Sequence, residues 1–299
     1  MQRLIIFYVC VIYFAISGQC QSMSWRDIVK KLQTERPRPD KIIAYDLDSL
    51  HFGELWLPAG EGPFPVVLLI HGGCWRADLP GTELLAFAAE DLKKQGFAVW
   101  NIEYRRVGHP AAGYPGTFQD VALAADYLTT LGQQYPLDLS RIIASGHSAG
   151  GHLALWTALR ANLPDTSPLY VAEPLKIHSV VSLAGIGNLK YFDHYGAPAC
   201  GQETISALID RDHRADAGYK DTSPVEMGPT AAKFWLINGV YDAAVPPHVA
   251  LNYVQQLKST PQVTELVIIQ DAGHFEIIVP WSEAWKIVLS TYKKAIASE

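Results

Sequence analysis

The chain has 299 residues, of which 49% are hydrophobic and 18% are charged, and its formal net charge is −6. This composition supplies enough apolar side chains for one large core and excludes a disordered chain. The negative charge argues against nucleic acid or an anionic membrane as a partner, and no internal repeat is present. We therefore expect one globular domain.

The first 21 residues differ in kind from the rest of the chain. Arg3 precedes an uncharged run from Leu4 to Ile16, and small and polar residues follow this run. The run is shorter than the roughly 20 residues of a membrane span, and its flanks have the order of a secretory signal peptide. We expect residues 1–21 to be the signal peptide and residues 22–299 to be the domain.

A signal peptide predicts a secreted or periplasmic protein whose mature chain has no stable membrane span. Two alternatives are a short membrane anchor and lipid attachment at Cys20, for which Gln19 is an unfavourable neighbour. Within the domain, Cys74 and Cys200 alone do not make a disulfide framework. No Cys or His spacing typical of zinc occurs, so we expect no metal site.

Strands and helices are expected to alternate from about residue 41. The run 65–71 is continuously apolar, as in a strand buried on both faces, whereas 50–58 alternates like an exposed strand. The expected strands are 50–58, 65–71, 97–104, 141–145, 177–185, 231–239 and 264–270. The expected helices are 81–96, 116–134, 149–162, 248–258 and 282–297.

This alternation predicts an α/β fold with a mostly parallel central sheet and helices on both of its faces. Functional side chains should then gather beyond the carboxyl ends of the strands. The alternation fails over residues 186–230, where the pattern predicts at most one short helix near 203–210. A segment this long without periodicity is usually functional, so we expect a small lid; the alternative is a surface insertion.

The pentapeptide Gly-His-Ser-Ala-Gly at residues 146–150 lies between a predicted strand and a predicted helix. This context is the one that a nucleophilic serine requires, because the sharp turn exposes the hydroxyl of Ser148 above the sheet. Small neighbours are needed where strand and helix nearly touch. The start of the helix also places the backbone N–H of Ala149 near the reacting atom.

A second glycine-rich turn, His-Gly-Gly-Cys-Trp, ends the strand at 65–71. We expect the N–H groups of Gly73 and Cys74 to bind an oxyanion together with that of Ala149. Cys74 is interpreted as a backbone donor with a packed thiol, since no base adjoins it, and His71 as a brace for the loop. Trp75 is a candidate substrate-binding residue, with a core aromatic as the alternative.

The nucleophile needs a base, and the base needs a carboxylate that orients it. His274 lies in the loop after the final predicted strand, and Asp242 follows the strand before it. Ser148, Asp242 and His274 therefore form the predicted catalytic triad, in the chain order of the α/β-hydrolase triad. Asp271 is the alternative acid, although its place in the histidine loop favours a role in shaping that turn.

These motifs resemble those of a known superfamily, the α/β-hydrolases of the esterase/lipase type. The sequence "HGGCW" is similar to the HGGG motif of hormone-sensitive-lipase-like esterases and to the HGG-x-W motif of kynurenine formamidases, and "GHSAGGHLA" is similar in both groups. The stretches "TSPVEM", "INGVYDAAVPP" and "AGHFEIIVP" resemble bacterial relatives and prolyl-oligopeptidase catalytic domains. The resemblance implies an α/β-hydrolase fold from about residue 41 to 297.

The expected function is cofactor-free hydrolysis of small carboxylic esters through an acyl-enzyme. The insertion at 186–230 is rich in Tyr, His and Asp, which with Trp75 predicts a closed, partly polar pocket for acyl groups of roughly two to four carbons. Three alternatives remain: an arylformamidase acting on N-formylkynurenine, a prolyl-oligopeptidase-like peptidase without the propeller domain, and a non-catalytic binding module.

Overall fold

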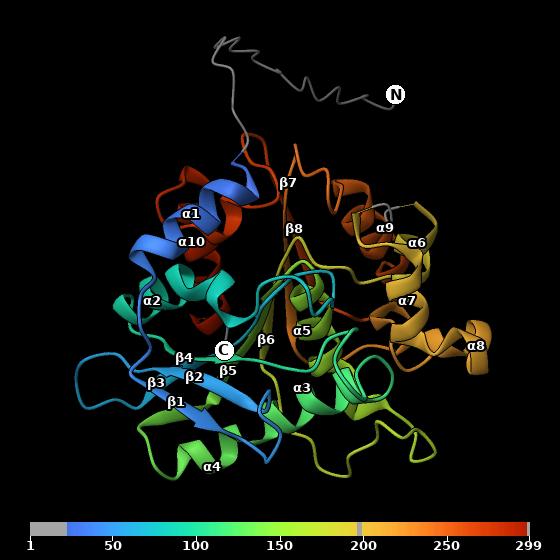
Figure 1. Cartoon of the computed structure of the whole chain (residues 1–299), viewed down its shortest axis with the longest axis horizontal. Helices are drawn as coiled ribbons and strands as arrows, with labels where there is room; N and C mark the ends of the chain where they lie inside the picture. The colour runs from blue at the N-terminus through green and yellow to red at the C-terminus, as the bar shows by residue number, and fades with distance from the viewer. Residues whose placement is uncertain (1–22, 196–198, 298–299) are drawn as a thin grey trace, which may run out of the picture.

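The computed structural model of the chain describes residues 23–195 and 199–297 (Figure 1). The predicted signal peptide at residues 1–21 lies outside the described residues. Within the part of the chain that the structure describes, no helix combines the length and the apolar character that a membrane crossing requires.

The centre of the molecule is an eight-stranded sheet with the order β1-β2-β4-β3-β5-β6-β7-β8. β1 and β2 are antiparallel to their neighbours, and the strands from β3 to β8 run parallel to one another. The strands are β1 Lys41–Ala44, β2 Phe52–Trp56, β3 Phe64–Ile70, β4 Ala98–Ile102, β5 Leu137–His147, β6 Ser179–Leu183, β7 Lys233–Gly239 and β8 Thr264–Ile269. The predicted mostly parallel sheet is confirmed.

Helices cover both faces of this sheet (Figure 1). α2 and α10 pack on one face, with α1 beside them, and α3, α5 and α9 lie on the other. The helices are α1 Trp25–Glu35, α2 Ala86–Lys94, α3 Gly116–Asp126, α4 Leu128–Gly132, α5 Ala149–Leu159, α6 Leu189–Tyr195, α7 Gln202–Ile209, α8 Arg211–Arg214, α9 Pro247–Leu257 and α10 Glu283–Ala297. Short 3-10 turns include η1 Thr82–Leu85 and η6 Glu276–Ile278.

The register of the parallel strands brings their carboxyl ends to one edge of the sheet. Ile70 of β3 pairs with Gly146 of β5, and His147 pairs with Leu183 of β6. Gly239 at the end of β7 pairs with Ile269 at the end of β8. The loops that follow these five strands therefore meet above the same edge.

The expectation of an exposed strand at 50–58 is wrong. In β2, the residues from Gly53 to Trp56 are all buried, because β1 and β4 pair with its two edges and the molecule covers both its faces. Glu54 is buried there because Arg36, Thr82 and Asn101 bond its carboxylate, at 2.7, 3.1 and 3.0 Å. A charged residue with three partners does not mark an exposed face.

The insertion at 186–230 holds more helix than the sequence predicted. α7 lies where the one short helix was expected, but α6 and α8 are present as well. α6 has seven residues and buries Leu189 and Phe192, and α8 has four residues and buries none, so both are too short to show a periodic pattern. Polar contacts also hold this segment together. Tyr219, for example, donates its hydroxyl hydrogen to Asp193 at 2.8 Å, and Arg211 bonds the same carboxylate.

Candidate active site

Ser148 occupies the sharp turn between β5 and α5, with the positive φ of 56° and a ψ of −118°. Small neighbours make this turn possible. A Cβ at Gly146 would lie 2.3 Å from the carbonyl oxygen of Gly150, and a Cβ at Gly150 would lie 2.0 Å from that of Ile70. The strand and the helix therefore approach as closely as the sequence predicted, and Ser148 is held above the carboxyl end of β5.

His274 and Asp242 meet in the loops after β8 and β7. Nδ1 of His274 lies 2.7 Å from Oδ2 of Asp242, whose side chain is fully buried. The other oxygen of Asp242 accepts the N–H groups of Ala244 and Val245 at 2.9 and 2.7 Å. Because these bonds fix the carboxylate, Oδ2 orients the imidazole of His274 so that its Nε2 points away from Asp242.

Ser148 and His274 line the same cavity of about 160 Å³ at this edge of the sheet. The cavity lies beyond the strand ends, where the sequence placed the functional residues. Its lining is mostly apolar and consists of Trp25, Gly73, Cys74, Leu79, Pro80, Leu84, His147, Ser148, Ala199, Cys200, Ala244, His274 and Phe275.

The described part of the insertion contributes Ala199 and Cys200 to this cavity. The expectation that its Tyr, His and Asp side chains make the pocket partly polar is therefore wrong for the described residues. Tyr191 and Tyr195 pack on one another at 4.8 Å beside a separate surface hollow, and Asp193 bonds Arg211. Polar residues of a mixed segment bond each other, which composition alone does not reveal.

The glycine-rich turn after β3 adopts a left-handed backbone, with φ values of 102° at Gly73, 51° at Cys74 and 53° at Trp75. Such values cost energy in residues other than glycine and occur mainly where the surroundings fix them. Here the N–H of Arg76 closes the turn on the carbonyl of Gly73 at 2.8 Å. Gly73 and Cys74 line the cavity with Ser148, and Ala149 begins α5 directly after it.

His71 braces this turn from below, in agreement with the sequence interpretation. Its ring is fully buried, bonds the carbonyl of Gly72 at 2.8 Å and the carboxylate of Glu103 at 3.0 Å, and stacks on Tyr104. Burial raises the pKa of Glu103, but His71 and Arg106 outweigh burial and bring the pKa to about 2. Glu103 therefore stays ionised and holds the histidine in place.

Trp75 lies in the core and is not among the residues that line the cavity. Its side chain is fully buried and packs edge-on against His152 at 5.3 Å and against Phe192 at 6.5 Å. This placement favours the alternative interpretation, in which Trp75 is a core aromatic under the turn. The flat apolar surfaces beside Ser148 and His274 are instead Trp25 and Phe275.

Cys74 and Cys200 form a disulfide, so the expected free, packed thiol at Cys74 is wrong. The bond joins the left-handed turn to the insertion across 126 residues of sequence. Sequence reasoning missed it because two cysteines so far apart reveal nothing of their separation in space. The bond fixes one wall of the cavity, since both residues line it.

Removal of this disulfide is expected to lower the free energy of unfolding by about 2–5 kcal/mol, because a long loop gains entropy in the unfolded chain. Urea unfolding of the double variant Cys74→Ala, Cys200→Ala measures this loss. Dithiothreitol should destabilise the wild type to a similar extent and leave the double variant unchanged. Equal midpoints for the wild type with and without reductant would contradict the assignment.

His147 is a residue that sequence reasoning did not single out. Burial, with a smaller contribution from the neighbouring His274, holds the pKa of its ring well below the ordinary value. The neutral ring donates from Nε2 to the carbonyl of His274 at 2.8 Å and packs on the His274 ring at 4.3 Å. The residue before Ser148 thus holds the histidine loop through a contact that Asp242 does not make.

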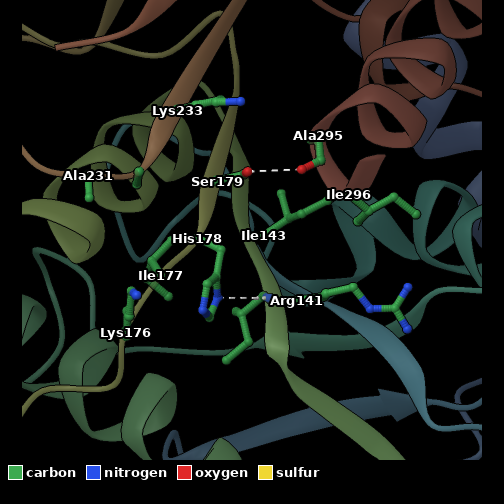
Figure 2. A pocket seen from close by; sticks show the side chains of 12 residues that line it. Arg141, Ile143, Lys176, Ile177, His178, Ser179, Ala231, Lys233, Ala295 and Ile296 are labelled. Atoms are coloured by element: carbon green, nitrogen blue, oxygen red, sulfur yellow. Dashed lines mark hydrogen bonds between the residues drawn. The ribbon is translucent and has the colours of Figure 1, made fainter. Parts of the chain in front are cut away.

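A second hollow, of about 170 Å³, lies beside the middle of β5 and the amino ends of β6 and β7 (Figure 2). It contains a serine and a histidine, but they do not face one another. Ser179 donates its hydroxyl hydrogen to the carbonyl of Ala295 at 3.0 Å, and His178 accepts the N–H of Ile142 at 3.2 Å. Within residues 23–195 and 199–297, no three His, Cys, Asp or Glu side chains form a group that could hold a metal ion.

The sheet order, the sharp turn at Ser148 and the acid and histidine after β7 and β8 define an α/β-hydrolase fold. The chain belongs to the BD-FAE family, whose model matches residues 54–257. The resemblance to α/β-hydrolases of the esterase/lipase type is thereby confirmed. His274 and α1 lie outside the matched region.

Known proteins of similar sequence or structure include several esterases. The chain is 27% identical to esterase LipC of Mycobacterium tuberculosis over 71% of this chain and 53% of that protein. Esterase B from Lactobacillus rhamnosis has a TM-score of 0.75 at 18% identity, covering 91% of this chain and 93% of that one. A truncated form of a carbohydrate esterase from gut microbiota has a TM-score of 0.71 at 21% identity, covering 88% of this chain and 98% of that one.

The chain spans about half the length of the curated relatives it matches. The two similar structures are 21% and 18% identical to this chain, and at these identities the similarity shows the fold alone.

Proposed function

We propose that this protein is a serine hydrolase that cleaves small carboxylic esters through an acyl-enzyme. The observation that carries the proposal is the arrangement at one cavity: Ser148 on its strained turn, and His274 held by the buried Asp242 at 2.7 Å. Its relatives support ester hydrolysis as the reaction. No cofactor is required for this chemistry.

In the first step, Oγ of Ser148 attacks the ester carbonyl while Nε2 of His274 takes the hydroxyl proton. Asp242 keeps the imidazole in the required tautomer and stabilises its positive charge as that charge develops. The N–H groups of Ala149, Gly73 and Cys74 stabilise the oxyanion of the tetrahedral intermediate. His274 then returns the proton to the departing alcohol, which leaves the acyl group on Ser148.

In the second step, water enters and His274 removes its proton, so that hydroxide adds to the acyl carbonyl. The same N–H groups stabilise the second oxyanion, and collapse of this intermediate releases the acid and returns the proton to Ser148. The disulfide and the His71–Glu103 brace support this step, because they hold the N–H groups of Gly73 and Cys74 in place. Donors that do not move between the two intermediates cost no free energy of reorganisation.

The small, mostly apolar cavity supports acyl groups of roughly two to four carbons. Each methylene that fits contributes about 0.8 kcal/mol of burial, and one that does not fit loses this gain and adds strain. We expect kcat/KM to be highest for p-nitrophenyl acetate or butyrate and to fall steeply for octanoate and palmitate, measured at one pH. A rise towards octanoate or palmitate would contradict the small acyl site.

The alternatives are separated by substrates assayed side by side. Acetylated sugars and feruloyl esters test the alcohol and acid that the site accepts, and N-formylkynurenine tests a formamidase. A kcat/KM for N-formylkynurenine above that for every ester would replace the proposed reaction with formamide hydrolysis. Inactivity on all substrates together with no fluorophosphonate labelling would favour a binding module.

We also propose that the protein works outside the cytoplasm. The Cys74–Cys200 disulfide supports this location, because disulfides form and persist in oxidising compartments and are rare in the cytosol. Fractionation of cells that express the full chain, followed by intact-mass measurement of the product, tests both the location and the removal of residues 1–21. A full-length product in the cytosolic fraction would contradict the proposal.

A further inference from the structure

The helix α1 reaches the cavity at its first residue, Trp25. This indole is half-buried and lines the cavity together with Ser148 and His274. Its ring packs on Phe275 at 5.8 Å, and Phe275 in turn packs edge-on against His274 at 5.1 Å. An aromatic series therefore runs from the start of α1 to the histidine.

The position of Trp25 is fixed by the way in which α1 begins. Ser24 caps the helix: its side chain accepts the N–H of Asp27, and the carboxylate of Asp27 accepts the N–H of Ser24 at 3.0 Å. Further along the helix, Ile28 and Leu32 are buried, and α1 contacts η1. Because η1 supplies Leu84 to the cavity, helix and cavity wall form one packed unit.

A buried carboxylate joins the start of this segment to the histidine loop. Glu276 is only 8% exposed; one of its oxygens accepts the N–H of Met23, and the other accepts the N–H of Gly273 at 2.9 Å. Gly273 directly precedes His274. A single side chain thus sets the spacing between Trp25 and the histidine.

We propose that Trp25 is a specificity-determining residue that limits the length of the acyl group, and that Glu276 positions it against the histidine loop. This inference rests on the proposed function and extends it. Trp25 and Glu276 both lie outside the residues that the family model matches, 54–257, so the acyl limit is set by a segment additional to the family region.

The test compares kcat/KM for p-nitrophenyl octanoate and p-nitrophenyl acetate in the wild type and in Trp25→Ala. Removal of the indole should admit further methylenes, each worth about 4-fold, so the octanoate-to-acetate ratio should rise at least about 10-fold. Trp25→Phe should give an intermediate ratio. Trp281→Ala is the matched control: Trp281 is 44% exposed, contacts Lys31 of α1 at 5.1 Å and does not line the cavity, so its ratio should equal that of the wild type.

Glu276→Gln tests the positioning role, because an amide cannot accept both N–H groups through the two atoms that now do so. This variant should raise the octanoate-to-acetate ratio, and combining it with Trp25→Ala should add nothing further to the ratio. A merely structural role would lower the activity on both esters equally and leave the ratio unchanged, which would overturn the assignment of Glu276.

Failure of this inference and failure of the proposed function give different results. A wild type that hydrolyses no ester and does not react with a fluorophosphonate overturns the proposed function, and the acyl limit with it. An active wild type whose ratio is the same in Trp25→Ala overturns the acyl limit alone. An equal rise in Trp281→Ala would also overturn it, because loosening of α1 would then explain the change.

Discussion

Ser148→Ala is expected to abolish labelling by a fluorophosphonate probe and to lower kcat by at least ~10³-fold. The oxyanion donors and the histidine remain in this variant, but no nucleophile is left to form the acyl-enzyme. The measurements are gel fluorescence of the labelled protein and kcat on p-nitrophenyl butyrate. Thermal unfolding should be close to that of the wild type, since alanine retains the Cβ and only a hydroxyl is lost.

Ser179→Ala is the matched control for this experiment. Ser179 also stands beside a histidine in a hollow, but at the opposite ends of the strands, and its hydroxyl bonds the carbonyl of Ala295. Labelling and kcat should both be retained. Labelling that persists in Ser148→Ala and disappears in Ser179→Ala would move the reactive serine to the hollow of Figure 2.

The strand ends could be predicted from the sequence because the patterns that define them are local. The run before Gly146 and the small residues around Ser148 describe a strand, a turn and a helix within one short stretch. Asp242 and His274 each follow a strand with an apolar run of its own. Since parallel strands align their carboxyl ends, three local patterns were sufficient to predict that Ser148, Asp242 and His274 lie at one edge of the sheet.

The remaining walls of the cavity could not be predicted in this way. Trp25 and Cys200 reach the cavity from segments with no periodic relation to the sheet, and only the folded chain shows that they line it. Glu276 did carry a signal, because it is the one charge inside the apolar run from Phe275 to Val279. A charge in such a run is buried with partners, although the sequence does not say which partners these are.

Asp242→Asn is expected to lower kcat on the order of 10⁴-fold while the fold is retained. The side-chain amide keeps the shape of the carboxylate, and the oxygen that accepts the N–H groups of Ala244 and Val245 can keep that role. The NH₂ group then faces Nδ1 of His274, which must act as an acceptor and carry its proton on Nε2. In that tautomer the histidine cannot take the proton of Ser148, so the loss falls on kcat rather than on KM.

Asp271→Asn is the comparison that makes the Asp242 result specific. Asp271 is exposed and lies three residues before His274, in the loop that carries the histidine. Its replacement by Asn removes one negative charge near His274, as Asp242→Asn does. The structure places the buried carboxylate of Asp242, with its fixed geometry, 2.7 Å from Nδ1 of His274. We therefore expect Asp271→Asn to lower kcat by less than about 10-fold, because water and salt screen the interaction of this exposed charge with His274. If Asp271→Asn instead caused the larger loss, Asp271 would be the orienting acid, and the loop after β8 would have to rearrange in the working enzyme.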